Sequence, residues 1–205
     1  MSSSTSSTGT QRRGRSATSP ADAAAAPRRL VVGMAGAPGA AYTVCLLRRL
    51  RELGVESHLV TCGCSRSIVY SETGLGLRQL RSKAHGWYHE RNQAASISSG
   101  SFLTLGMIIV PCTMRSLAAI VTGMADNLVQ RAADVTLKEG RRLVVAMAES
   151  TSSPIGQQNL RRAEDAGVRV VMLPPAGSSP MVTERVEELL DQFGLGAVAA
   201  RHAVS

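Results

Sequence analysis

The chain has few aromatic residues, no long hydrophobic run and no secretory segment at its N-terminus. Phe, Trp and Tyr make up 3% of its 205 residues, so the core must be built from aliphatic side chains and Met. No apolar run approaches the roughly 20 residues that span a bilayer. The N-terminus lacks the apolar stretch of a signal peptide. We therefore expect a cytoplasmic protein with no membrane partner.

The cysteines do not follow the spacing of a metal or redox motif. Cys62 and Cys64 are separated by one residue, which is closer than in CxxC motifs, and Cys45 and Cys112 stand alone. This usage is typical of a reduced cytoplasmic protein. His85 and His89 have helical metal-site spacing, but a glycine lies between them, so we interpret residues 83–91 as a solvated loop. The sequence predicts no metal site.

The positive charge is not arranged as a nucleic-acid interface. The formal net charge is +8, and five arginines and one aspartate among residues 1–29 supply half of it. The remaining basic residues are interspersed with acidic ones and form no stripe with aromatic residues. We expect no nucleic-acid partner. Residues 1–28 are rich in Ser, Thr, Gly, Arg and Ala without periodicity, which predicts a disordered tail before a single domain over residues 29–205.

Short apolar strands alternate with helical patterns along the domain. We expect strands at 30–32, 55–61, 107–110, 143–147 and 168–172, the third of them stopped by Pro111. Asp126-Asn127 is predicted to cap a helix that ends at Lys138, and Thr183 to cap the last helix, 184–193. This alternation is typical of an α/β fold with a parallel sheet covered by helices on both sides.

A glycine-rich turn, residues 33–39, follows the first strand and leads into a helix from Ala41. A helix N-terminus after such a turn is a natural seat for phosphate, although a tight turn that binds nothing is the alternative. Ligands of parallel sheets bind beyond the carboxyl ends of the strands. Small, hydroxyl or thiol residues gather at those predicted ends, in the segments 33–39, 62–65, 112–116 and 149–153.

Four segments closely resemble the flavin prenyltransferase family, which belongs to the superfamily of homo-oligomeric flavin-containing cysteine decarboxylases. The segments are 94–102 (AASISSGSF), 106–107 (GM), 111–117 (PCTMRSL) and 131–139 (RAADVTLKE). The resemblance implies a flavodoxin-like, Rossmann-like three-layer sandwich, bound FMN, and a homotrimer that assembles into a homododecamer.

The resemblance also implies which residues contact FMN. Backbone N–H groups and hydroxyls there suit a phosphate and a ring edge, and an arginine adds a charged donor. Thr113 and Ser116 are the strongest of these predictions. The full set of implied contacts is Gly36, Ala37, Pro38, Cys62, Thr113, Met114, Arg115 and Ser116.

The sequence departs from the prenyltransferase pattern where that family holds the prenyl phosphate. Pro38 replaces a functional serine and removes both a hydroxyl and an N–H. Cys62 replaces another serine, and the Arg-Glu-Thr-Pro-Leu-His segment becomes 148–153 (AESTSS), which keeps only the glutamate. Pro-Ala-Phe-Tyr becomes 175–178 (PAGS). In the last helix a basic residue becomes Glu188, whose carboxylate would repel a phosphate.

These departures favour a different flavin reaction. Cypemycin decarboxylase, of the linaridin branch, exemplifies FMN-dependent oxidative decarboxylation of a peptide's C-terminal cysteine, which gives an enethiol for aminovinyl-cysteine formation. We interpret the chain as such an oxidoreductase or lyase of peptide natural product biosynthesis, with a peptide ending in Cys as its partner. The alternatives are a flavin prenyltransferase, which joins FMN and dimethylallyl phosphate, and a non-catalytic flavin-binding partner subunit.

Three polar residues are candidates for catalysis. Glu149 ends a predicted strand at the ligand edge and is the candidate acid or base, although a helix-side cap is the plainer interpretation. Glu72 aligns with an acidic residue near the family's site, and a solvated helix face is its alternative. Asn127 is a predicted N-cap whose amide would also suit a substrate carboxylate. His58 lies within a strand and is expected to be a satisfied core residue.

Overall fold

The computed structural model describes residues 28–36, 38–62, 65–148, 152–175 and 179–196 of the chain. Strands and helices alternate through these residues. The elements are β1 (Arg29–Met34), α2 (Ala40–Glu52), β2 (Glu56–Thr61), α3 (Ser65–Thr73), α4 (Leu77–Arg81), β3 (Gly86–His89), η1 (Ser96–Ser98), β4 (Gly106–Cys112), α5 (Met114–Val121), α6 (Leu128–Lys138), β5 (Arg142–Met147), α7 (Pro154–Asp165), β6 (Arg169–Met172) and α8 (Ser179–Asp191).

The strands form one parallel sheet in the order β3-β2-β1-β4-β5-β6. The chain builds the sheet outward from β1 in one direction and then from β4 in the other. The strand order therefore reverses between β1 and β4, and this is where a doubly wound sheet opens a crevice for a ligand. The structure confirms the predicted α/β, flavodoxin-like fold.

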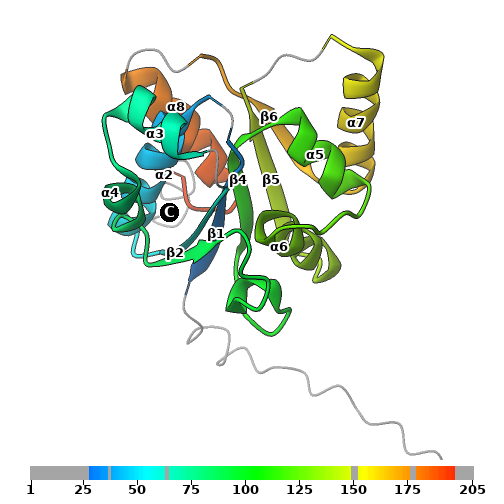
Figure 1. The fold of residues 1–205 in the computed structure, drawn as a ribbon, viewed down its shortest axis with the longest axis horizontal. Helices are drawn as coiled ribbons and strands as arrows, with labels where there is room; N and C mark the ends of the chain where they lie inside the picture. The colour runs from blue at the N-terminus through cyan, green and yellow to red at the C-terminus, as the bar shows by residue number, and fades with distance from the viewer. Residues whose placement is uncertain (1–27, 37, 63–64, 149–151, 176–178, 197–205) are drawn as a thin grey trace, which may run out of the picture.

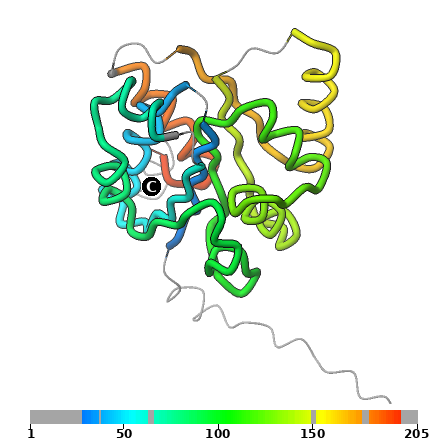
Figure 2. Tube along the Cα trace, viewed as in Figure 1, coloured from blue at the N-terminus to red at the C-terminus, as the bar shows by residue number. Residues whose placement is uncertain are grey.

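Helices cover both faces of the sheet (Figures 1 and 2). One face carries α2, α3, α4 and α8, and the other carries α5, α6 and α7. Each face has its own apolar cluster, built largely from aliphatic side chains and methionines as the scarcity of aromatic residues predicted. The sheet thus has a buried core on both sides, and its carboxyl edge remains available for a functional site.

The structure corrects three predictions of secondary structure. Residues 86–89, interpreted as a loop, form β3, a polar edge strand that pairs with β2. Pro111 lies within β4, at a register irregularity where the missing N–H is tolerated, and its carbonyl accepts a hydrogen bond from the Ala35 N–H. The last helix, α8, begins at Ser179, so Thr183 lies inside it instead of capping it.

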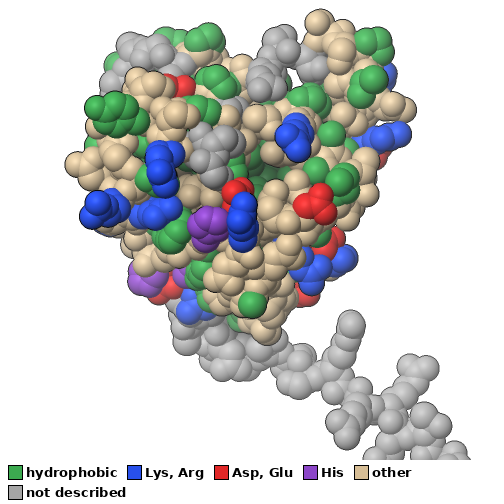
Figure 3. Space-filling model, viewed as in Figure 1, with side chains coloured by type: hydrophobic (Ala, Val, Ile, Leu, Met, Phe, Trp, Pro, Cys, Tyr) green, Lys and Arg blue, Asp and Glu red, His purple; other side chains and the backbone are tan. Residues whose placement is uncertain are grey.

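No helix of the described residues is long and apolar enough to cross a membrane. On the face shown in Figure 3, Lys and Arg side chains lie among Asp and Glu without a continuous basic stripe.

Candidate functional site

The loops after β1, β2 and β4 begin side by side at the carboxyl edge of the sheet. The Ala35 N–H donates to the Pro111 carbonyl at 3.0 Å, and the Cys62 N–H donates to the Met34 carbonyl at 3.1 Å. The chain then leaves β1 toward α2 on one face and leaves β4 toward α5 on the other. The predicted gathering of these loops at one edge is therefore correct, and it falls at the switch point between β1 and β4.

The glycine-rich turn adopts a backbone that only glycine accepts easily. Gly36 has φ +77° and Gly39 has φ +116°, in the region where a Cβ is strained. A Cβ on Gly39 would also lie 3.4 Å from the Tyr42 ring and 3.5 Å from Pro111. These distances are ordinary contacts, so the positive φ is what favours glycine at this position.

The N-terminus of α2 is occupied by a carboxylate of the protein itself. The Gly39 N–H donates to both oxygens of Glu72 at 2.9 Å, and the Ala40 N–H donates to Glu72 Oε2 at 2.6 Å. Gly39 has no side chain with which to cap the helix, and Glu72, near the end of α3, takes that place from 33 residues away. In this structure an internal anion therefore uses the donors that were predicted to bind a phosphate.

The N-terminus of α5 shows a different arrangement. Thr113 Oγ1 accepts a hydrogen bond from the Ser116 N–H at 3.1 Å and donates to Ser116 Oγ at 3.1 Å. The threonine hydroxyl is therefore engaged as an N-cap, while the Ser116 hydroxyl retains its own proton to donate. Arg115, the next charged donor, is exposed. Met114 is fixed by the buried Asn159 of α7, whose Nδ2 lies 3.9 Å from its sulfur.

A cavity of about 390 Å³, here called the loop cavity, opens beside the glycine-rich turn. Its described lining is mostly apolar with one carboxylate, and it includes no Lys, Arg or His. The lining residues are Pro38, Gly39, Glu72, Ala148, Pro174 and Pro175. Pro174 is held in place by the fully buried Tyr42, whose hydroxyl donates to the Pro174 carbonyl at 2.9 Å. Burial raises the pKa of Tyr42, and the nearby Arg185 opposes that shift.

The structure brings together only part of the predicted catalytic set. Glu72 lines the loop cavity, but Asn127 is the N-cap of α6 and its side chain accepts a hydrogen bond from the Gln130 N–H at 3.1 Å. Glu149 and Ala37 lie outside the described residues. The Glu188 carboxylate is bound by the Arg185 guanidinium on the same helix, which offsets the charge that was expected to repel a phosphate.

Two features of the cavity were not singled out from the sequence. Gly39 and Pro174 line it, and the signals for them were weak: a glycine at a helix start and the first of two prolines after a strand. Ala148 and Pro175 line it as well, at positions where the departures from the family pattern were noted. Within the described residues, no three His, Cys, Asp or Glu side chains lie close enough together to hold a metal ion.

The residues at this edge fit a flavin mononucleotide. The Ser116 hydroxyl and the exposed Arg115 guanidinium lie at the start of α5, where the helix dipole also favours a phosphate. The mostly apolar wall formed by Pro38, Pro174 and Pro175 suits a flat ring. The N-terminus of α2, in contrast, is closed to phosphate while Glu72 holds it.

Comparison with known proteins identifies the family. The model of the Flavoprotein family matches residues 18–203. A "Probable UbiX-like flavin prenyltransferase" of Streptomyces sp. (strain D7) is 48% identical over 180 residues, which cover 84% of this chain and 90% of that protein.

Solved structures agree with this assignment. The "dodecameric FMN-dependent Ubix-like Decarboxylase" of Escherichia coli O157:H7 has a TM-score of 0.76 at 42% identity, covering 82% of this chain and 95% of its own. AnUbiX (PadA1), solved with FMN and dimethylallyl pyrophosphate, has a TM-score of 0.78 at 39% identity, covering 85% and 96%.

The predicted closeness to cypemycin decarboxylase is not confirmed. The structure of CypD has a TM-score of 0.58 at 17% identity, covering 80% of this chain and 94% of its own, which shows a shared fold alone. A relative with 48% identity over 90% of its own length shows much more. The chain belongs to the Flavoprotein family and, within it, to the UbiX-like flavin prenyltransferases.

Proposed function

We propose that this protein is an FMN-dependent enzyme that transfers a dimethylallyl group from dimethylallyl phosphate to reduced FMN. The observation that carries the proposal is the 48% identity, over 90% of its length, to a protein named as a probable flavin prenyltransferase. AnUbiX, solved with FMN and a dimethylallyl diphosphate, supports the same pairing of cofactor and substrate at 39% identity. These two similarities favour prenyl transfer, the alternative from the sequence, over peptide decarboxylation.

Each loop of the site has a part in the proposed reaction. Reduced FMN would supply the nucleophilic ring to which the dimethylallyl carbon bonds as the C–O bond breaks and phosphate leaves. Ser116 and Arg115 at α5 would hold the flavin phosphate, with Thr113 and Met114 shaping that helix start. Gly36, Ala37, Pro38 and Cys62 would border the ring. The apolar prolines of the loop cavity would exclude water from the reacting carbon.

Glu72 and Glu149 are the candidate acid–base groups of the proposed reaction. Glu72 lines the loop cavity, and it would serve as the proton acceptor or donor only after its carboxylate leaves the N–H groups of Gly39 and Ala40. Glu149 follows β5 at the same edge in the sequence and is proposed on that ground alone. Asn127 is not retained as catalytic, because it caps α6 and is not among the described residues that line the loop cavity.

The proposal is tested by incubating the purified protein with reduced FMN and dimethylallyl phosphate without oxygen. We expect prenylated FMN, identified by mass spectrometry, and release of one phosphate for each flavin modified. Ser116→Ala should weaken FMN binding by about tenfold, because it removes a hydrogen bond to a charged group. Ser98→Ala removes a hydroxyl of η1 and serves as the matched control. Tight FMN binding without prenylated product would contradict the proposal.

One observation favours a second candidate, the oxidative decarboxylation of a peptide's C-terminal cysteine. The described lining of the loop cavity has a carboxylate and no cation, which is an unusual environment for a phosphate substrate. In this reaction the cysteine loses CO2 and two hydrogens, and FMN takes up the two electrons. A short peptide ending in Cys, incubated with the oxidised holoenzyme, would show that mass loss. An unchanged peptide would exclude the second candidate for the sequence tested.

The assembly predicted from the sequence belongs to the same proposal. The Escherichia coli relative is described as dodecameric, and we propose that this chain also forms trimers that assemble into a dodecamer. Light scattering after size-exclusion chromatography tests this directly. A monomer at micromolar concentration would contradict it.

A further inference from the structure

Glu72 also lines a second cavity. It has a volume of about 420 Å³ and lies between α2, α3 and α8, which share one face of the sheet (Figure 1). We call it the α2–α8 cavity. Its lining residues are Ala41, Val44, Cys45, Arg48, Glu72, Thr73, Lys83, Val182 and Thr183.

The lining combines an apolar floor with two cations. Ala41, Val44 and Val182 supply the apolar part, and Arg48 and Lys83 supply the charge. The α2 residues recur with spacings of three and four, so they lie along one face of that helix. Such a lining is complementary to a small molecule that has an apolar chain and an anionic head.

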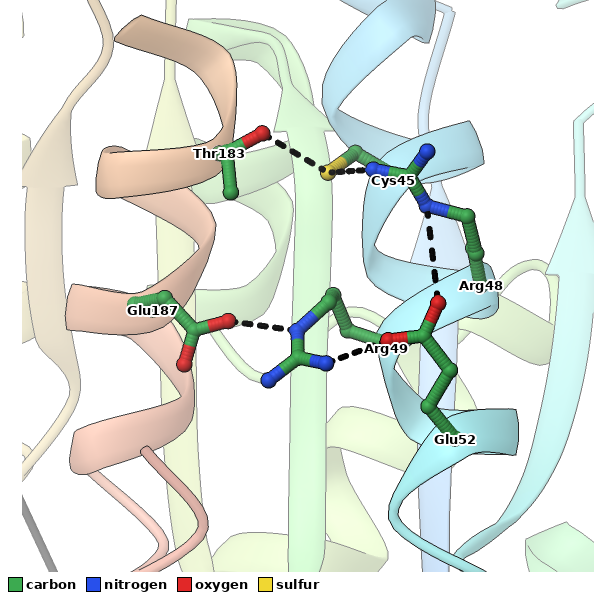
Figure 4. Close-up of polar contacts among 6 residues, drawn as sticks. All are labelled: Cys45, Arg48, Arg49, Glu52, Thr183 and Glu187. Carbon is green, nitrogen blue, oxygen red and sulfur yellow. Dashed lines mark hydrogen bonds and ion pairs between the residues drawn. The ribbon is translucent and has the colours of Figure 1, made fainter. Parts of the chain in front are cut away.

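Arg48 has poor partners compared with its neighbour Arg49 (Figure 4). The Arg48 guanidinium lies 3.7 Å from Cys45 Sγ and 3.9 Å from Glu52 Oε1. Arg49, in contrast, binds Glu187 of α8 at 2.5 Å and also binds Glu52. A thiol is a weak acceptor, so an oxyanion in the cavity would give Arg48 shorter, charge-assisted hydrogen bonds.

The second cation is also available for a ligand. Within the described residues, no carboxylate lies within 4.0 Å of the Lys83 ammonium. Glu72 is the one carboxylate in the lining, and its oxygens accept the N–H groups of Gly39 and Ala40. The positive end of α2 therefore offsets the charge of Glu72, and the cavity remains favourable for an anion.

We propose that the α2–α8 cavity binds an organic anion with a short apolar chain, such as an alkyl phosphate or an alkyl carboxylate. The head binds between Arg48 and Lys83, and the chain lies over Ala41, Val44 and Val182. This site is separate from the loop cavity, and it goes beyond the proposed prenyl transfer because it requires neither FMN nor a reaction.

Calorimetry on the full-length protein tests the site with four probes of matched size or charge. Hexyl phosphate and hexanoate carry both features, 1-hexanol lacks the charge, and inorganic phosphate lacks the chain. We expect saturable binding of at least one of the first two, with the single-feature probes about tenfold weaker, because a hydrogen bond to a charged group is worth a factor of that order. The stronger of the two anions identifies the headgroup.

Variants locate the binding. Arg48→Gln and Lys83→Gln are each expected to weaken the better probe by about tenfold, whereas Arg161→Gln on the exposed surface of α7 is the matched control. The probe should also slow alkylation of Cys45, which lines the cavity, as read by peptide mass spectrometry. No saturable binding, or equal binding by the two cavity variants and the control, would overturn the proposal.

Discussion

At the scale of single residues, the contact that most shapes the candidate site is the one between Glu72 and the start of α2. Gly39 gives the turn its left-handed conformation but leaves the helix without a side-chain cap. Glu72 completes it with three hydrogen bonds from two backbone N–H groups. The same carboxylate lines both cavities, so one residue ties the helix start, the glycine-rich turn and α3 together.

Replacing Glu72 by Gln is expected to lower the free energy of unfolding by about 1 kcal/mol. The variant loses the favourable charge at the helix N-terminus, and its amide NH2 group cannot accept the N–H groups. Denaturant unfolding measures the loss, and hydrogen exchange should show faster exchange of the Gly39 and Ala40 amides. Glu164→Gln, near the end of α7, is the matched control. Unchanged exchange at Gly39 and Ala40 would show that the contact does not hold the helix in solution.

The contact between Glu72 and the start of α2 could not be predicted from the sequence, for a physical reason. A helix cap is a local interaction when the capping side chain stands beside the helix start, as Thr113 and Asn127 do. Glu72 acts across 33 residues, and nothing in the spacing of the chain indicates which carboxylate arrives at Gly39. The glycine-rich turn predicted N–H donors that suit an anion, and in this structure those donors bind the Glu72 carboxylate.

At the scale of the elements, a helix cap was predicted correctly from neighbouring residues, whereas the edge strand and the start of the last helix were not. Asn127 was predicted as an N-cap and is one, because the cap depends on residues within one turn. β3 was missed because an edge strand exposes one side to water and keeps polar residues such as His89. The start of α8 was placed too late, although Pro180 is well tolerated in a first helical turn.

Two substitutions of Asn127, the N-cap of α6, distinguish a structural role of this residue from a catalytic one. Asn127→Ala is expected to lower stability by about 1 kcal/mol, because the Gln130 N–H loses its acceptor. Asn127→Asp keeps a capping oxygen and should remain within about 0.5 kcal/mol of the parent. Thermal unfolding and flavin turnover are measured on both variants. An Asp variant that is stable but inactive would restore Asn127 to the catalytic set.

At the scale of the whole molecule, the two ends of the sheet have different tasks. The carboxyl edge holds the turn, the caps and the loop cavity. The opposite edge holds a cluster of ionisable groups at the start of β2. Arg29 binds Glu56 at 2.8 Å, and both His58 and His85 approach the same carboxylate, at 3.8 and 3.9 Å. Protonation of this distant cluster is therefore expected to change stability without changing the loops of the site.

His58 and Glu56 should make the fold less stable as the pH falls, in two separate ranges. Burial lowers the pKa of His58, with Arg29 and His85 adding to the shift and Glu56 opposing it. His58 Nδ1 also pairs with the Tyr88 hydroxyl at 3.0 Å. The unfolded chain then binds more protons than the folded one below pH about 6.5, so stability falls there by at most about 1.4 kcal/mol per pH unit.

The second pH range is set by the Glu56 carboxylate. The hydrogen bond from Arg29 lowers the pKa of Glu56, so its contribution is present above pH about 4.5 and is lost as the pH falls through the folded value. Urea unfolding between about pH 3 and pH 8 covers both ranges. His58→Gln should flatten the curve between pH 5 and pH 6.5 and leave the part below pH 4.5. Glu56→Gln should flatten the part below pH 4.5 and keep the fall between pH 5 and pH 6.5, because Glu56 raises the pKa of His58 and its loss lowers that pKa further. Parallel curves for His58→Gln and the parent between pH 5 and pH 6.5 would place the titrating group elsewhere.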